Sequence, residues 1–232
     1  MKDFSPTMRV KDVVELIVKP ATEVERVSFI DLMSPGLYVK PTAFVSHAFG
    51  NPFHLLVKSL LSHFRDAVPS EVFVWIDVFI INQHDPGADL HGGQTLKATI
   101  EASPSVVVVL DREALPLKRL WCLYEIGSSS PEKLILLTHG FDESQLGAAF
   151  SKIDANEAKC FYPSDTTRIR AHVRQMMVEH KTVFEDADET TALTAFSGLL
   201  KLLLILKRLI EAAMRKTWPR CWLELLEMRN IP

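Results

Sequence analysis

Short apolar runs alternate with segments of helical spacing along this chain, and this alternation limits the possible folds more than any other feature of the sequence. Four of the runs are rich in β-branched and aromatic residues and a fifth is weaker; the predicted strands are 42–47, 71–81, 105–111, 132–139 and 158–162. Alternating strands and helices are typical of a parallel sheet with helices on both faces. The sequence therefore predicts an α/β fold, a flavodoxin-like open parallel sheet of five strands with helices on both faces.

The segments between the strands carry apolar residues three and four positions apart, which is the spacing of a helix that buries one face. Predicted helices cover 51–64, 92–104 and 165–180, and a further helix begins near Leu117. The run 71–81 is nearly all apolar, as expected for a central strand that is buried on both faces.

Two extensions flank the alternating region, which covers residues 41–183. Residues 1–40 contain one short predicted helix and a linker with prolines, and residues 184–232 form a predicted C-terminal helical extension. Within it, residues 192–216 are predicted to be an apolar helix used for docking or oligomerisation. Its apolar part, residues 192–210, contains Lys201 and falls short of the roughly 20 mainly apolar residues of a membrane span unless that charge lies in the bilayer. We therefore expect it to pack on the domain or on a partner, without membrane contact.

Composition narrows the functional classes. The chain has 232 residues and 47% of them are apolar, which suffices for a real core. The net charge is −3 and the basic residues are scattered, which argues against nucleic acid as the main partner. Cys122, Cys160 and Cys221 are far apart in the sequence and show no paired spacing, so we expect reduced thiols rather than disulfides. The N-terminus is polar and charged and does not resemble a signal peptide. We expect a cytoplasmic protein.

Topology alone predicts where a ligand would bind. In an open parallel sheet, ligands bind at the carboxyl ends of the strands, where the strand order reverses; in the order 2-1-3-4-5 this point lies between strands 1 and 3. The segment 46–53 should therefore face the segment 111–125. Trp121 and Glu125 are four positions apart and share one helix face. Glu125 lies either on the wet side of that helix or in a dry pocket, and its predicted position favours the pocket.

Four motifs occur in order along this region. They are AFVSHAFG, VFVWIDVF, LKATIEASPSVVVVLD and RLWCLYEI. Together they resemble the sequence boxes of Toll/interleukin-1 receptor (TIR) domains of the bacterial, plant and algal type. The last one is similar to the Trp-Cys-x-x-Glu box of plant members. The resemblance covers about residues 42–140.

The resemblance implies cleavage of NAD+ at its nicotinamide–ribose bond, which releases nicotinamide and either ADP-ribose or its cyclised form, with NAD+ as a substrate and no cofactor. It assigns the catalytic glutamate to Glu125, and it implies a set of substrate-binding residues: Ser46, His47, Phe49, Asp77 and Trp121. It also implies that the loop 82–93 gates the site and mediates self-association, so that TIR–TIR contacts give a homo-oligomer in signalling or defence.

One carboxylate suffices for this reaction. Ordinary glycosidases need a second carboxyl to protonate the leaving group, but the pyridinium of NAD+ leaves as neutral nicotinamide. A single buried carboxylate can hold the ribose hydroxyls and stabilise the oxocarbenium ion. Ala48 and Phe49 stand where plant members carry an arginine, so the positive group for the diphosphate is expected from Arg112, Lys118 or Arg119.

Two other functions remain open: a TIR module that only assembles, with Glu125 structural, and an enzyme of the same fold that cuts nucleoside or nucleotide N-glycosidic bonds. Other sites are not supported. Ser46 and His47 are strand neighbours that point to opposite faces, so they cannot form a hydrolase pair. The histidines at 84 and 91 are better explained by an acidic loop than by a metal site, and no Lys-Ser/Thr follows the glycine pair at 92–93.

Overall fold

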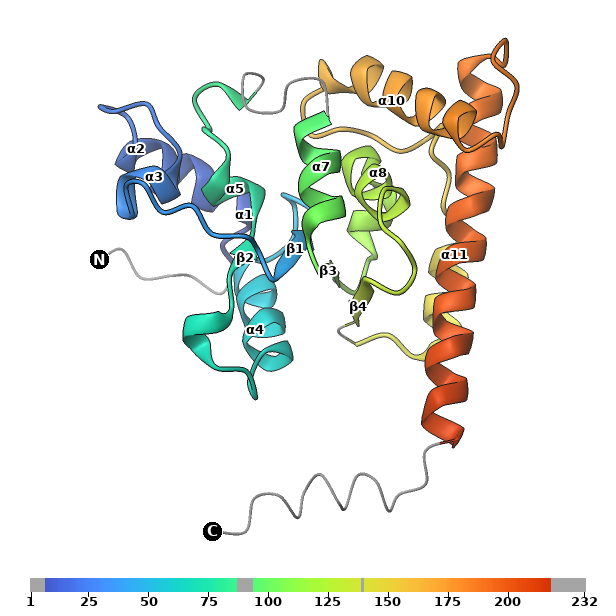
Figure 1. The fold of residues 1–232 in the computed structure, drawn as a ribbon, viewed down its shortest axis with the longest axis horizontal. Helices are drawn as coiled ribbons and strands as arrows, with labels where there is room; N and C mark the ends of the chain where they lie inside the picture. The colour runs from blue at the N-terminus through green and yellow to red at the C-terminus, as the bar shows by residue number, and fades with distance from the viewer. Residues whose placement is uncertain (1–6, 87–93, 139, 218–232) are drawn as a thin grey trace.

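The protein is built on a parallel four-stranded sheet with the strand order β2-β1-β3-β4 (Figure 1). The structure is a computed structural model that describes residues 7–86, 94–138 and 140–217. The strands are β1 (Ala43–Ser46), β2 (Val74–Trp75), β3 (Ser105–Leu110) and β4 (Leu134–Thr138). In the central pair, Ala43 of β1 aligns with Ser105 of β3. The predicted α/β fold with a parallel sheet is confirmed.

Helices connect and cover the strands. In chain order they are α1 (Val10–Val13), a π-helical turn η1 (Val14–Val18), α2 (Lys19–Ala21), α3 (Phe29–Met33), α4 (Phe53–His63), the 3₁₀ turn η2 (Pro69–Glu71), α5 (Asp77–Ile80), α7 (Gln94–Ala102), the 3₁₀ turn η4 (Leu115–Lys118), α8 (Leu120–Gly127), α9 (Glu143–Ser151), α10 (Asp165–Glu179) and α11 (Glu189–Thr217). The predicted helices at 51–64, 92–104, 165–180 and 192–216 correspond to α4, α7, α10 and α11.

Two predicted strands differ from the structure. The run 71–81 forms only the two-residue strand β2, because Asp77 accepts a hydrogen bond from the backbone N–H of Val78 at 2.7 Å and the chain turns there into α5. The predicted fifth strand at 158–162 is reduced to a single parallel bridge between Lys159 and Arg119. Its partner cannot extend the pairing, because Arg119 is directly followed by the first residue of α8.

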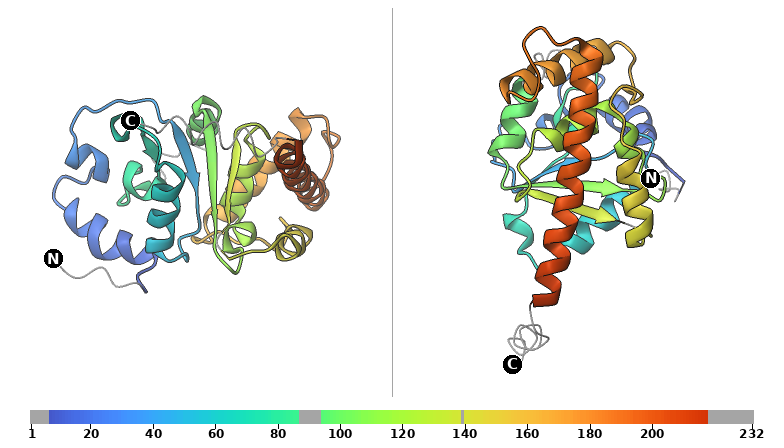
Figure 2. Two further views of the ribbon diagram at one scale, coloured as in Figure 1. Left: turned by 90° about the horizontal axis from the view of Figure 1, so that it is seen from below. Right: turned by 90° about the vertical axis from the view of Figure 1, so that its right-hand side faces the viewer.

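Helices lie on both faces of the sheet, as predicted (Figure 2). Side chains of β3 alternate between two apolar clusters, as strand geometry requires. Val106 and Val108 belong to a cluster with residues of α7, α8, α10 and α11. Val107 and Val109 belong to a second cluster with residues of α1, η1 and α4. The sheet therefore has a core on each side, and the N-terminal extension contributes to one of them.

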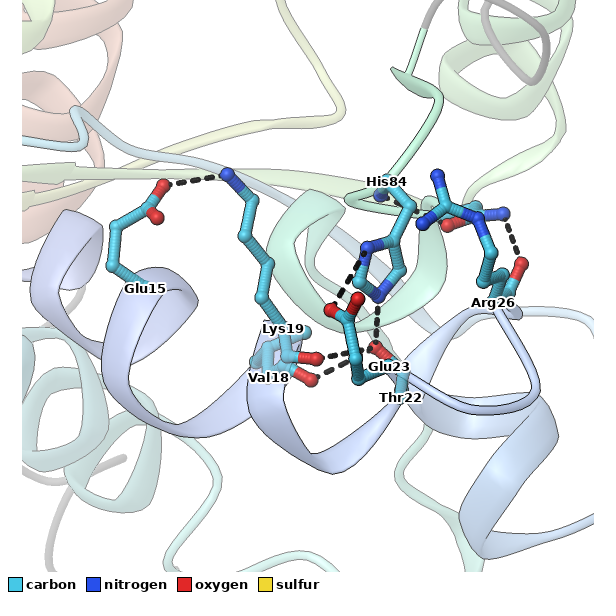
Figure 3. Close-up of polar contacts among 8 residues, drawn as sticks. Glu15, Val18, Lys19, Thr22, Glu23, Arg26 and His84 are labelled. Atoms are coloured by element: carbon cyan, nitrogen blue, oxygen red, sulfur yellow. Dashed lines mark hydrogen bonds and ion pairs between the residues drawn. The ribbon is translucent and has the colours of Figure 1, made fainter.

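The N-terminal helices also hold the loop that follows α5 (Figure 3). The Thr22 hydroxyl donates to the carbonyl oxygen of Val18 at 2.8 Å. A hydroxyl has one proton, so it accepts from Nε2 of His84, which lies 2.9 Å away. The side-chain amide of Asn82 donates to the carbonyl oxygen of Arg26 at 2.6 Å. Two side chains of the loop are thereby fixed to the N-terminal segment.

The long helix α11 forms the outer layer on the opposite side of the molecule (Figure 2). Its inner face buries Phe196, Leu200 and Leu204 in the core. Phe196 packs so closely on α8 that a Cβ at Gly127 would lie 2.7 Å from its Cζ atom. Large aliphatic side chains remain 42–60% exposed on the other face: Leu202, Ile205, Leu206, Leu209 and Ile210. No helix within the described ranges is long and apolar enough to cross a membrane.

Candidate functional site

Glu125 lies on the dry side of α8. Ser46, the last residue of β1, donates a hydrogen bond from Oγ to Glu125 Oε2 at 2.5 Å. The side chain of Glu125 is 9% exposed and Ser46 is fully buried. The first strand and the helix after the third strand therefore meet at the carboxyl edge of the sheet, where topology predicts a ligand.

The surroundings of Glu125 disfavour its charge. Burial raises the pKa of this carboxyl well above its usual range, because a charged group loses its hydration there. The hydrogen bond from Ser46 lowers the pKa and the negative charge of Asp77 raises it, but the effect of burial is the largest. Glu125 consequently retains its proton at pH values where an exposed glutamate is ionised.

A cavity of about 100 Å³ opens beside this carboxyl. Its walls include His47, Phe49, Asp77, Trp121 and Glu125, so most of the predicted site residues surround one space. Ser46 does not line it and reaches it only through Glu125. The volume is below the 300–1,000 Å³ that is common for small-molecule pockets. This volume is that of the cavity formed by the described residues. Pro86 also lines the cavity, and it directly precedes residues 87–93, which lie outside the described part.

His47 and Asp77 join the first and second sequence motifs. His47 Nε2 lies 3.0 Å from Asp77 Oδ1, which is an ion-pair distance, although the ring N–H does not point along the line that a hydrogen bond requires. The backbone carbonyl of His47 accepts a hydrogen bond from Cys122 Sγ at 3.2 Å. Ser46 thus contacts Glu125 and His47 contacts Asp77, so the structure gives no support to a Ser–His hydrolase pair.

The indole of Trp121 forms a fixed wall of the cavity. Its Nε1 donates to Asp165 Oδ2 at 3.1 Å, and Asp165 also accepts from Arg168 at 2.9 Å. The Arg168 guanidinium lies 5.6 Å from the centre of the indole ring. No motif of the sequence indicated these two partners, which lie in the first turn of α10.

Aromatic side chains lie along the rim of the cavity. Phe49 and Phe161 are 5.3 Å apart between ring centres, and Phe161 contacts Tyr162 edge to face at 5.0 Å. Phe161 is 43% exposed and Tyr162 is 41% exposed. Cys160 also lines the cavity. Cys160, Phe161 and Tyr162 form the carboxyl end of the predicted fifth strand, and parallel strands end at the same sheet edge, so topology could have indicated them.

Only one of the three predicted cations faces the cavity. Arg119 lines it, together with Lys159, which the sequence analysis did not consider. Arg112 and Lys118 line a separate groove against α9. Arg112 crosses the turn at Gly140, where φ is +78° and a Cβ would lie 2.9 Å from Arg112 Nε.

The loop after α5 is described in part. Gln83 lines the cavity and donates to the carbonyl oxygens of Asp77 and Ile81. Residues 87–93 of the predicted gating loop 82–93 lie outside the described residues, as do Asp89 and His91. The described ranges contain no group of three side chains suited to hold a metal ion.

Comparison with known proteins adds no identity: the chain matches no protein-family model, no curated protein and no solved structure. The site must therefore be interpreted from its own geometry. It combines a shielded carboxyl, a rigid indole wall, a buried histidine and two cations at the carboxyl edge of a parallel sheet.

Proposed function

We propose that this chain is a TIR-type enzyme that cleaves the nicotinamide–ribose bond of NAD+ and releases nicotinamide and ADP-ribose. The observation that carries the proposal is the position of Glu125: shielded from water, bonded to Ser46 and close to the indole of Trp121. The strand order 2-1-3-4 supports the fold assignment, because it equals the first four strands of the flavodoxin-like order 2-1-3-4-5.

The proposed reaction is a hydrolysis at C1′ of the nicotinamide ribose. The C1′–N bond breaks and its electron pair goes to the pyridinium nitrogen, so nicotinamide leaves neutral. The ionised Glu125 stabilises the positive charge that develops on the ribose, and its attraction is strong because the site has a low local dielectric. A water molecule adds to C1′, and its proton passes to the Glu125 carboxylate and then to solvent.

The raised pKa of Glu125 is compatible with this role. Without substrate, the neutral carboxyl avoids the cost of a buried charge. A bound pyridinium places a positive charge beside it, and a nearby opposite charge favours the ionised form. The active form therefore appears on binding the cationic substrate.

A scaffold without turnover is the second candidate. The exposed aliphatic side chains of α11 favour it, since contiguous exposed apolar surface commonly marks an interaction site. The same surface is also compatible with an enzyme that is activated by self-association.

Nicotinamide release separates the two functions. Purified protein is incubated with NAD+ at increasing protein concentration and with a crowding agent, because assembly is expected to promote activity. The Glu125→Gln variant keeps the size of the side chain and should lose release at unchanged thermal stability or higher. Glu101→Gln, a substitution at an exposed position of α7, should leave release unchanged. If the parent protein releases no nicotinamide under any of these conditions, the scaffold is the better description.

A further inference from the structure

Arg119 has an unusual environment for a guanidinium. Its Nη2 atom is buried and has no hydrogen-bond partner among the residues that the structure describes. Buried donors are nearly always paired, and an unpaired one costs free energy. Arg119 lines the same cavity as Glu125. Pairing this donor with an anionic group of a ligand would therefore remove that cost.

Lys159 is paired with Arg119 by backbone contacts. The two residues form the parallel bridge that replaces the predicted fifth strand, and the Leu120 N–H donates to the Lys159 carbonyl at 3.2 Å. Both side chains line the cavity. Lys159 is exposed, and the described part of the chain offers it no ion pair. Two cationic residues thus occupy paired backbone positions in the cavity wall.

The acidic residues of the cavity already have partners. Asp165 is bound by Trp121 Nε1 and by Arg168, Asp77 lies against His47, and Glu125 accepts from Ser46. None of these contacts involves Arg119 or Lys159. Within the described lining, neither cation is therefore paired with a carboxylate.

We infer that Arg119 and Lys159 form a diphosphate subsite, which makes the site select a dinucleotide over the corresponding nucleoside. This inference rests on the proposed function and names the group that determines substrate class. Arg119 directly precedes α8, and Glu125 lies five positions after the first residue of that helix, about 7.5 Å along its axis. The diphosphate of NAD+ is separated from the scissile bond by one ribose, so its subsite must lie near Glu125 but not at it.

The two side chains suit different parts of this task. The planar guanidinium of Arg119 can bind phosphate oxygens with two parallel hydrogen bonds. Lys159 supplies a point charge from an exposed position, so its contribution is screened by solvent and salt. We expect Arg119 to contribute most of the affinity and Lys159 to add to it at low ionic strength.

Direct binding tests the subsite without any turnover. ADP-ribose is titrated into the full chain and its variants by calorimetry. Arg119→Met should weaken binding about 10- to 100-fold, the effect of losing a charge-assisted hydrogen bond. Arg119→Lys should recover part of it, and Lys159→Met should weaken binding mainly at low salt. Lys152→Met, in the separate groove, is the matched control and should change nothing. Unchanged affinity in Arg119→Met would overturn the subsite.

Substrate selectivity gives the second measurement. Arg119→Met should lower kcat/KM for NAD+ and leave that for nicotinamide riboside, which lacks the diphosphate, within about twofold of the parent value. Equal losses on both substrates would overturn the subsite and indicate a general structural effect. If the parent protein cleaves neither substrate but its ADP-ribose binding depends on Arg119, the subsite stands and the proposed function fails. If the parent protein cleaves NAD+ but its ADP-ribose binding does not depend on Arg119, the subsite fails and the proposed function stands.

Discussion

Replacing Ser46 with alanine tests whether the hydroxyl at the end of β1 controls the ionisation of Glu125. Ser46 Oγ donates to Glu125 Oε2 at 2.5 Å, and neither side chain is open to solvent. This hydrogen bond lowers the pKa of the carboxyl, whereas burial and the charge of Asp77 raise it. The variant should therefore have a Glu125 that ionises at still higher pH.

The size of the effect follows from the strength of the bond. A hydrogen bond to a charged group contributes about 1.5–3 kcal/mol. Since 1.36 kcal/mol corresponds to a factor of ten, the ionised fraction of Glu125 should fall about 10- to 150-fold wherever the carboxyl is mostly protonated. With the ionised form active, kcat/KM for NAD+ should fall by the same factor in that pH range. At higher pH, where both proteins are ionised, the two profiles should converge.

The assay is nicotinamide release across pH, together with the ¹³C chemical shift of the Glu125 carboxyl, which reports ionisation without turnover. Ser103→Ala is the matched control, because Ser103 is equally buried and donates at 2.8 Å to the carbonyl oxygen of Thr99 in the preceding helix α7. Its profile should equal that of the parent protein. A loss of equal size at every pH in Ser46→Ala would refute the reasoning, since it would show that the hydroxyl acts on the substrate rather than on the carboxyl. An unchanged chemical-shift titration would refute it as well.

Three further predictions concern stability and assembly. Because burial raises the pKa of Glu125, the native state holds a proton that the unfolded state releases, so stability falls as pH rises from the ordinary glutamate range through the raised pKa. Glu125→Gln should therefore have a higher Tm than the parent protein at neutral pH and an equal Tm at low pH. A Tm difference that does not change with pH would contradict this. Gly127→Ala should lower the free energy of unfolding by about 1–3 kcal/mol in urea titrations, because the added methyl overlaps the ring of Phe196; a stabilised variant would show that α11 shifts freely. Aspartate at both Leu206 and Leu209 should abolish concentration-dependent association in light scattering if α11 mediates it, and an unchanged mass would assign association to another surface.

The sheet could be predicted because β1, β3 and β4 are short, largely apolar runs, as expected for strands that are covered on both faces. The limits of β2 could not, since an apolar run does not distinguish a strand from a short buried helix. There the hydrogen bond from the Val78 N–H to the Asp77 side chain marks the end of the strand.

The candidate site could likewise be predicted only in part from the sequence. Trp121 and Glu125 share a wall through their spacing on one helix, and Ser46 reaches Glu125 through the strand order. The contributions of Asp165 and Lys159 depend on how distant segments pack against α8, and no local pattern encodes such contacts. Residues from beyond the recognisable motifs therefore complete the cavity.

The contacts of the N-terminal helices limit how this protein can be divided. Val10 and Val14 share a core with Val107 and Val109 of β3, and Thr22 holds His84, the neighbour of the cavity-lining Gln83. A recombinant fragment that begins at residue 41 would lose part of the apolar cover of one sheet face and the contact that holds His84. The α/β part is consequently not an independent unit, and a chimaeric protein that contains it must also include residues 10–26.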